Sequence, residues 1–144
     1  MFRGNHSILM DGYVDFRIGS PDKPDPKWDV TRRAMGRARA LAERIEVATL
    51  VPRAKLASTG YCLAVPAASG GAFGCAVYVS QGGETTVDLT AVRGRLAAEW
   101  IDAKSGERRS ATSVPGGSRR EFVVPFSGPA ILWLTENRGT VDRD

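Results

Sequence analysis

Short apolar runs recur through the middle of the chain and are separated by glycine-rich turns. Three of these runs lie close together, at Tyr61–Val65, Cys75–Val79 and Thr85–Leu89. Valine, tyrosine and threonine suit a pleated, half-buried surface, so each run predicts a β-strand. The third run alternates strictly, with Thr86 and Asp88 on its polar side, which is typical of a sheet that has one solvent-facing surface.

The pattern of short strands continues to the end of the chain. Glycines at Gly82-Gly83 accept positive φ without steric cost, which favours a tight two-residue hairpin between the second and third runs. Strands are also expected at Arg95–Ile101, Glu107–Thr112, Glu121–Phe126 and Ala130–Leu134. Short strands with turns between them and no intervening helix predict an antiparallel β-sandwich or barrel.

A helical period precedes the strands and predicts one long amphipathic helix from Pro26 to Glu46. Asp25 is a suitable N-cap, and proline at the first helical position loses nothing by lacking an N–H. Arg39 and Glu43 form an i,i+4 pair off the apolar stripe. The stripe consists of Val30, Ala34, Met35, Ala38, Leu41, Ala42 and Ile45. A helix of about 30 Å must cover either a face of the sandwich or a partner outside this chain.

The segments on either side of the helix allow two interpretations each. Residues 1–11 are either a buried strand followed by a functional loop or a frayed tail. Residues Val47–Val51 end at Pro52 and form either a short strand or an extended connector.

Composition indicates a globular chain and excludes several classes of function. The 144 residues are 42% hydrophobic and 25% charged, with a net charge of +4 and a pI near 9.4. The arginines are scattered and lack interleaved aromatic residues, so nucleic acid is not an expected partner. No apolar run approaches the length of a membrane helix, and Met1–Met10 lacks the features of a signal peptide, which leaves localisation unknown.

The two cysteines, Cys62 and Cys75, are too few for a disulfide framework or a metal cluster. If the turn between their strands centres near Ser69, the register places Val77 opposite Cys62. Directly facing sulfur atoms are then disfavoured, and two buried thiols are expected rather than a disulfide.

Catalytic motifs are scarce in the chain. The single histidine, His6, has no nucleophile elbow beside it and no converging metal ligands. Phosphate-binding glycine loops are absent, so no cofactor and no metal are expected. Glu99 and Asp88 are candidates for glycoside chemistry by residue type alone. The aromatic residues expected in the core or, alternatively, on a sugar-stacking platform are Tyr61, Tyr78, Trp100, Phe122 and Trp133.

Several stretches resemble one family of bacterial glycoside-hydrolase-like proteins. The most specific is LASTGYCLAVP at Leu56–Pro66, after MFRGNHSILMD at Met1–Asp11 and PKWDVTRRAMGRARALAERI at Pro26–Ile45. Further matches are VDLT at Val87–Thr90, the W-x-D-x-x-x-G-E pattern at Trp100–Glu107, and PFSGPAILWL at Pro125–Leu134. Members of this family carry a (β/α)8 barrel followed by a small C-terminal β-sandwich that is named for collagen binding.

The resemblance implies a domain organisation. Residues 1–52 would be a remnant of the last barrel strand and helix, residues 53–135 the C-terminal sandwich, and residues 136–144 a disordered tail. It also implies that His6 and Asp11 border the ligand-binding face of the parent barrel, while the catalytic carboxylates lie on earlier strands outside this chain.

Three functions follow as hypotheses. The first is a non-catalytic accessory sandwich of a glycoside-hydrolase-like protein, whose partners are a catalytic barrel domain and a carbohydrate. The second is a free-standing module that binds a glycan or a matrix protein. The third is a small enzyme that uses His6.

Overall fold

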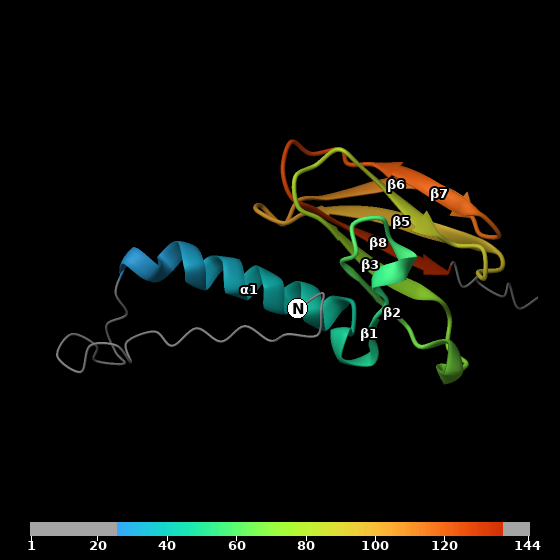
Figure 1. The fold of residues 1–144 in the computed structure, drawn as a ribbon. Coiled ribbons are helices and arrows are strands. Elements are labelled where there is room, and N and C mark those ends of the chain that lie inside the picture. Colours follow the sequence, from blue (N-terminus) through green and yellow to red (C-terminus); the bar gives the residue numbers. More distant parts are fainter. Residues whose placement is uncertain (1–25, 137–144) are drawn as a thin grey trace, which may run out of the picture. The chain divides into compact units, whose positions relative to one another are not determined.

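The computed structural model describes residues 26–136, which form one long helix followed by a series of short strands (Figure 1). The chain divides into two compact units between Val47 and Ala48. Helix α1 spans Asp29–Arg44. The strands are β1 (Val51–Pro52), β2 (Cys62–Ala64), β3 (Gly74–Val79), β4 (Glu84–Asp88), β5 (Arg95–Asp102), β6 (Arg108–Pro115), β7 (Arg119–Val123) and β8 (Ala130–Glu136).

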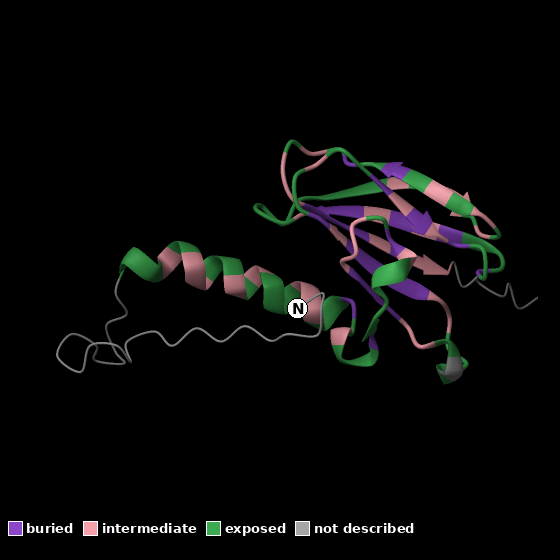
Figure 2. Cartoon of the chain, in the orientation of Figure 1, coloured by how far each residue is buried: buried purple, intermediate pink, exposed green. Residues whose placement is uncertain are grey.

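Helix α1 confirms the predicted amphipathic helix, but it is shorter than predicted. Pro26–Trp28 forms a 3-10 turn, and the helix stops at Arg44 because Glu46 takes a left-handed φ of 49°. The predicted pair is present, since Arg39 Nε donates to Glu43 Oε1 at 2.8 Å. No residue of α1 is buried, and Val30 of the predicted stripe is 68% exposed (Figure 2).

The strands form two antiparallel sheets, which confirms the predicted sandwich. The larger sheet has six strands in the order β1-β2-β3-β8-β5-β6, and the smaller sheet pairs β4 with β7. Figure 2 shows buried residues concentrated along both sheets. The core contains side chains from each sheet, for example Val77 and Leu132 from the larger and Val87 and Phe122 from the smaller.

The predicted hairpin at Gly82-Gly83 is wrong. Strand β3 pairs with β2 and β8, whereas β4 pairs with β7, so the chain crosses from one sheet to the other at this turn. Both glycines do take positive φ, 73° and 81°. Positive φ therefore serves a crossover turn here, and local turn chemistry does not distinguish the two connections.

Several strand boundaries also differ from the prediction. Of Val47–Val51, residues Val47–Thr49 form a 3-10 turn, and only Val51–Pro52 pairs with β2. Strand β6 extends to Pro115, beyond the predicted end at Thr112. Proline is tolerated there because β6 is an edge strand.

The cysteines behave as predicted. Cys62 pairs with Val77 across β2 and β3, and both cysteines are free and buried. A hydrogen bond with Cys62, together with burial, raises the pKa of the Cys75 thiol well above its ordinary range. The same hydrogen bond lowers the pKa of the Cys62 thiol. Both side chains belong to the hydrophobic core.

Candidate functional site

The two residues predicted to border a ligand site, His6 and Asp11, lie outside the described residues. Their placement at the rim of a parent barrel stays a prediction. The candidate sites on the described part of the chain lie on the sandwich.

The two acids that were candidates by type, Glu99 and Asp88, do not come together. Glu99 lies on β5 in the larger sheet, and Asp88 ends β4 in the smaller sheet. Each is paired with its own arginine: Glu99 Oε1 lies 3.7 Å from Arg108 Nη1, and Asp88 Oδ2 lies 3.3 Å from Arg119 Nε. These carboxylates therefore do not form the facing pair that glycoside cleavage uses.

The five aromatic residues divide between two environments. Trp100 and Phe122 are 3% and 6% exposed and belong to the core. Tyr61, Tyr78 and Trp133 are half-buried on the opposite side of the larger sheet. The rings of Tyr61 and Tyr78 meet edge to face, with centroids 6.1 Å apart and an interplanar angle of 87°.

The side of the larger sheet that faces away from the core is largely apolar. We call it the outer face and define it by the apolar members of two rows that follow the strand register: Leu63, Ala76 and Trp133 in one row, and Tyr61, Tyr78, Ile131 and Ile101 in the other. The first row continues to Glu99 and the second to Arg108. Its aliphatic members are buried, with exposed fractions of 2% for Leu63, 0% for Ala76 and 6% for both Ile101 and Ile131. None of these four residues belongs to the core cluster between the sheets.

The outer face is also indicated in the sequence, by two continuous apolar runs that do not alternate with polar residues. A strand that is buried on one side only alternates, whereas a strand buried on both sides is a continuous apolar run. Residues Cys75–Val79 and Ala130–Leu134 are such runs, and their strands β3 and β8 pair with each other in the middle of the larger sheet. Continuous runs at these positions indicate that both faces of the sheet are covered.

Trp133 lies closely over the neighbouring strand on the outer face. A Cβ atom at Gly74 would come within 3.2 Å of Cη2 of the Trp133 ring. Glycine at this position on β3 leaves room for the Trp133 ring, which a larger residue would crowd.

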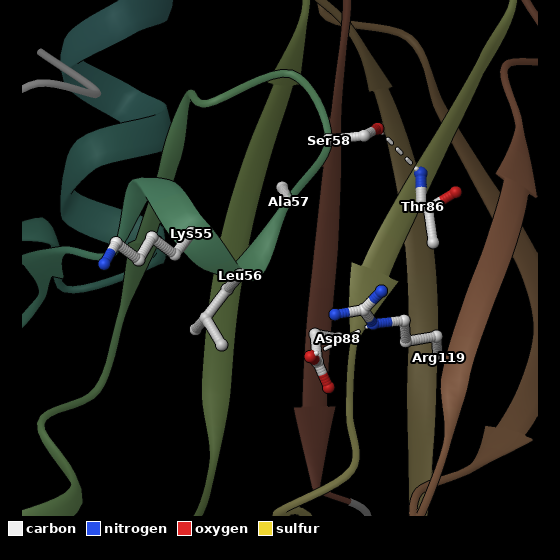
Figure 3. Close-up of a pocket in the computed structure, with 7 residues that line it drawn as sticks. All are labelled: Lys55, Leu56, Ala57, Ser58, Thr86, Asp88 and Arg119. Atoms are coloured by element: carbon white, nitrogen blue, oxygen red, sulfur yellow. Dashed lines mark hydrogen bonds and ion pairs between the residues drawn. The ribbon is translucent and has the colours of Figure 1, made fainter.

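A small polar hollow of about 320 Å³ lies beside the smaller sheet (Figure 3). Ser58 Oγ accepts a hydrogen bond from the Thr86 N–H at 3.0 Å, and Arg119 reaches across to Asp88 (Figure 3). Hydrogen bonds from the side chain and backbone of Thr90, together with Arg119, hold the pKa of Asp88 below its ordinary value of 3.8. Asp88 is therefore ionised at neutral pH and unsuited to act as a general acid there.

Neither a metal site nor a membrane helix is found within residues 26–136. In that range no three histidine, cysteine or acidic side chains converge as metal ligands. The described helices are too short or too polar to cross a bilayer.

Comparisons with known proteins agree with the fold. No family model and no curated protein matches the sequence. Among solved structures, the chain is similar to one described as a glycoside hydrolase, with a TM-score of 0.63 and 16% identity over 80% of this chain. It is also similar to a glycoside hydrolase family 5 structure from Bacteroides vulgatus, with a TM-score of 0.59 and 16% identity over 73% of this chain.

The matched region is a minor part of both solved structures. This chain spans 28% of the first and 24% of the second. At this level of identity the similarity shows only that these larger proteins contain a region of similar fold.

Proposed function

We propose that the chain is a non-catalytic accessory β-sandwich of a glycoside-hydrolase-like protein and that its outer face packs against a catalytic barrel domain. The apolar character of the outer face carries this proposal. A sheet face that is open to water is normally polar. On the outer face the aliphatic side chains are already buried, so the surface that would contact a partner is formed by the half-buried rings of Tyr61, Tyr78 and Trp133. Two glycoside hydrolase structures that extend far beyond the matched region support a catalytic domain as the partner.

A non-catalytic role agrees with the chemistry of the described residues. Glycoside cleavage needs an acid and a second carboxylate held across a cleft. The sandwich acids Glu99 and Asp88 lie on different sheets, and each is paired with an arginine of its own sheet. We expect the purified chain to hydrolyse no aryl-glycoside. Turnover that is lost on His6→Ala would contradict the proposal and favour the small-enzyme hypothesis.

The docking role is tested by supplying the catalytic domain in trans. The probe is the barrel domain encoded immediately upstream in the source genome, co-expressed with this chain and purified through a tag on the barrel. We expect co-purification of the chain, and loss of co-purification for Trp133→Ser or Tyr78→Ser on the outer face. The matched control is Val123→Ser, because Val123 is 68% exposed on β7 of the smaller sheet. An upstream region without a barrel, or equal recovery of all the variants, would refute the proposal.

A second candidate function is binding of a glycan or matrix protein by the sandwich on its own. The polar hollow beside the smaller sheet favours it, because concave surfaces with a few polar groups are the usual form of ligand sites. A binding screen against glycans and collagen separates this function from docking. A matrix-binding module would bind without any barrel domain and would be insensitive to Trp133→Ser.

A further inference from the structure

A larger hollow of about 540 Å³ adjoins the polar hollow, with Leu56 and Asp88 lining both. Its volume falls within the range of small-molecule sites. Apolar side chains line one part of it, among them Leu56, Val65, Phe73 and Val92. Phe73 and Leu56 are only partly buried and pack against the core, so they offer a firm apolar surface to a ligand.

Two arginines, Arg53 and Arg93, also line this hollow and are exposed. Within residues 26–136, neither guanidinium forms an ion pair. The two acids that line the hollow, Glu136 and Asp88, already accept hydrogen bonds from the protein. Glu136 Oε2 accepts the Phe73 N–H at 3.0 Å, and Asp88 accepts from Thr90 and Arg119.

The hollow therefore combines three chemical functions. Free guanidinium groups bind carboxylates, frequently through two parallel hydrogen bonds. The carboxylate oxygens of Glu136 and Asp88 have lone pairs left to accept from hydroxyl groups. The ring of Phe73 offers an apolar surface to the C–H face of a pyranose. A ligand that matches all three carries carboxylates, many hydroxyl groups and apolar ring faces.

We propose that this hollow binds an acidic glycan, through uronic acid carboxylates on Arg53 and Arg93 and sugar hydroxyls on Glu136 and Asp88. An acidic peptide matches less well, because its carboxylates would meet Glu136 and Asp88 without the hydroxyl donors that those acids accept from. A neutral glycan leaves both arginines without a counter-charge. None of the residues that define the outer face lines this hollow, so the proposal does not depend on docking to a barrel.

The test uses the full chain and trigalacturonic acid, with its fully methyl-esterified form as the matched neutral ligand. Isothermal titration at low ionic strength should detect binding of the acid and at least tenfold weaker binding of the ester. Arg53→Gln and Arg93→Gln should each weaken binding of the acid about tenfold, equivalent to about 1.4 kcal/mol. Arg33→Gln removes the same charge from an exposed position on α1 and should leave the affinity unchanged.

Added salt should weaken binding of the acid, because the pairing groups are exposed to solvent. Equal binding of acid and ester would overturn the assignment of the arginines. Binding of hexaglutamate with the same sensitivity to Arg53→Gln and Arg93→Gln would replace the glycan with an acidic peptide. Absence of binding to trigalacturonic acid in a protein that retains its melting transition would overturn the proposal altogether. None of these outcomes bears on docking of the outer face.

Discussion

Cys62 on β2 lies opposite Val77 on β3 and not opposite Cys75, although both sulfur atoms belong to the same core cluster. Cys75 instead pairs with Ala64, which lies two residues further along β2 on the same face of the sheet. Facing Cα atoms suit a disulfide, whereas a diagonal offset moves the Cβ atoms apart. The free thiols are a consequence of strand register.

The first prediction concerns the reactivity of these thiols. Both should fail to react with a thiol reagent at pH 8 in the folded protein, because burial excludes the reagent. The raised pKa of Cys75 also keeps that thiol protonated, whereas the hydrogen bond with Cys75 lowers the pKa of Cys62, so Cys62 is protected by burial alone. In denaturant without reductant, a colorimetric titration should find both thiols free. A titre of zero after unfolding would indicate a disulfide and contradict the register.

The second prediction concerns the core. Leu132 on β8 is fully buried between the sheets. Leu132→Ala should lower the free energy of unfolding by about 2–5 kcal/mol, because it removes apolar contacts and leaves a cavity. The control Val123→Ala alters an exposed side chain and should change stability by less than about 0.5 kcal/mol. Urea unfolding measures both variants, and similar losses in the two would contradict the sandwich packing.

The third prediction uses a pair of glycines. A Cβ atom at Gly116 would overlap the backbone carbonyl oxygen of Val92, whereas a Cβ at Gly36 on α1 meets nothing within 4 Å. Gly116→Ala should destabilise the sandwich by about 1–3 kcal/mol through forced backbone movement. Gly36→Ala should increase helical circular dichroism, since alanine favours a helix interior by about 1 kcal/mol over glycine. A harmless Gly116→Ala would show that the turn relaxes freely.

The fourth prediction concerns acid stability. Hydrogen bonds from Thr90, with Arg119, depress the pKa of Asp88 in the folded protein. A depressed carboxyl pKa contributes stability that is fully present above the unfolded value of 3.8 and is lost as the pH falls through the folded value. Asp88→Asn should therefore lower the melting temperature at pH 6 and have little effect near pH 2. An equal effect at both pH values would show that the carboxylate charge is not involved.

The fifth prediction concerns the division of the chain. Every member of the core cluster lies between Ala57 and Leu134. A protein of residues 48–144 should therefore keep one cooperative unfolding transition in a calorimeter. Loss of this transition would place the first 47 residues in the folding unit of the sandwich and would contradict the proposed boundary at residue 52.

Local patterns in the sequence were enough for the fold class and for the cysteines. The helical period from Val30 to Ile45 and the alternation in Thr85–Leu89 each depend on residues a few positions apart, so they predict their own elements. The offset of Cys62 from Cys75 follows from a turn between their strands that centres near Ser69. These features need no knowledge of distant contacts.

Only the tertiary structure decided which strands pair and which faces become sites. The glycines at Gly82-Gly83 suit a hairpin and a crossover equally, and pairing of β3 with β8 was decided by contacts between residues that are more than 50 positions apart. The outer face and the larger hollow have the same origin. Trp133 meets Gly74, and Arg53 and Arg93 line one hollow with Glu136, because the sheets bring distant segments together. Such assemblies follow from long-range packing, which no local period in a single sequence records.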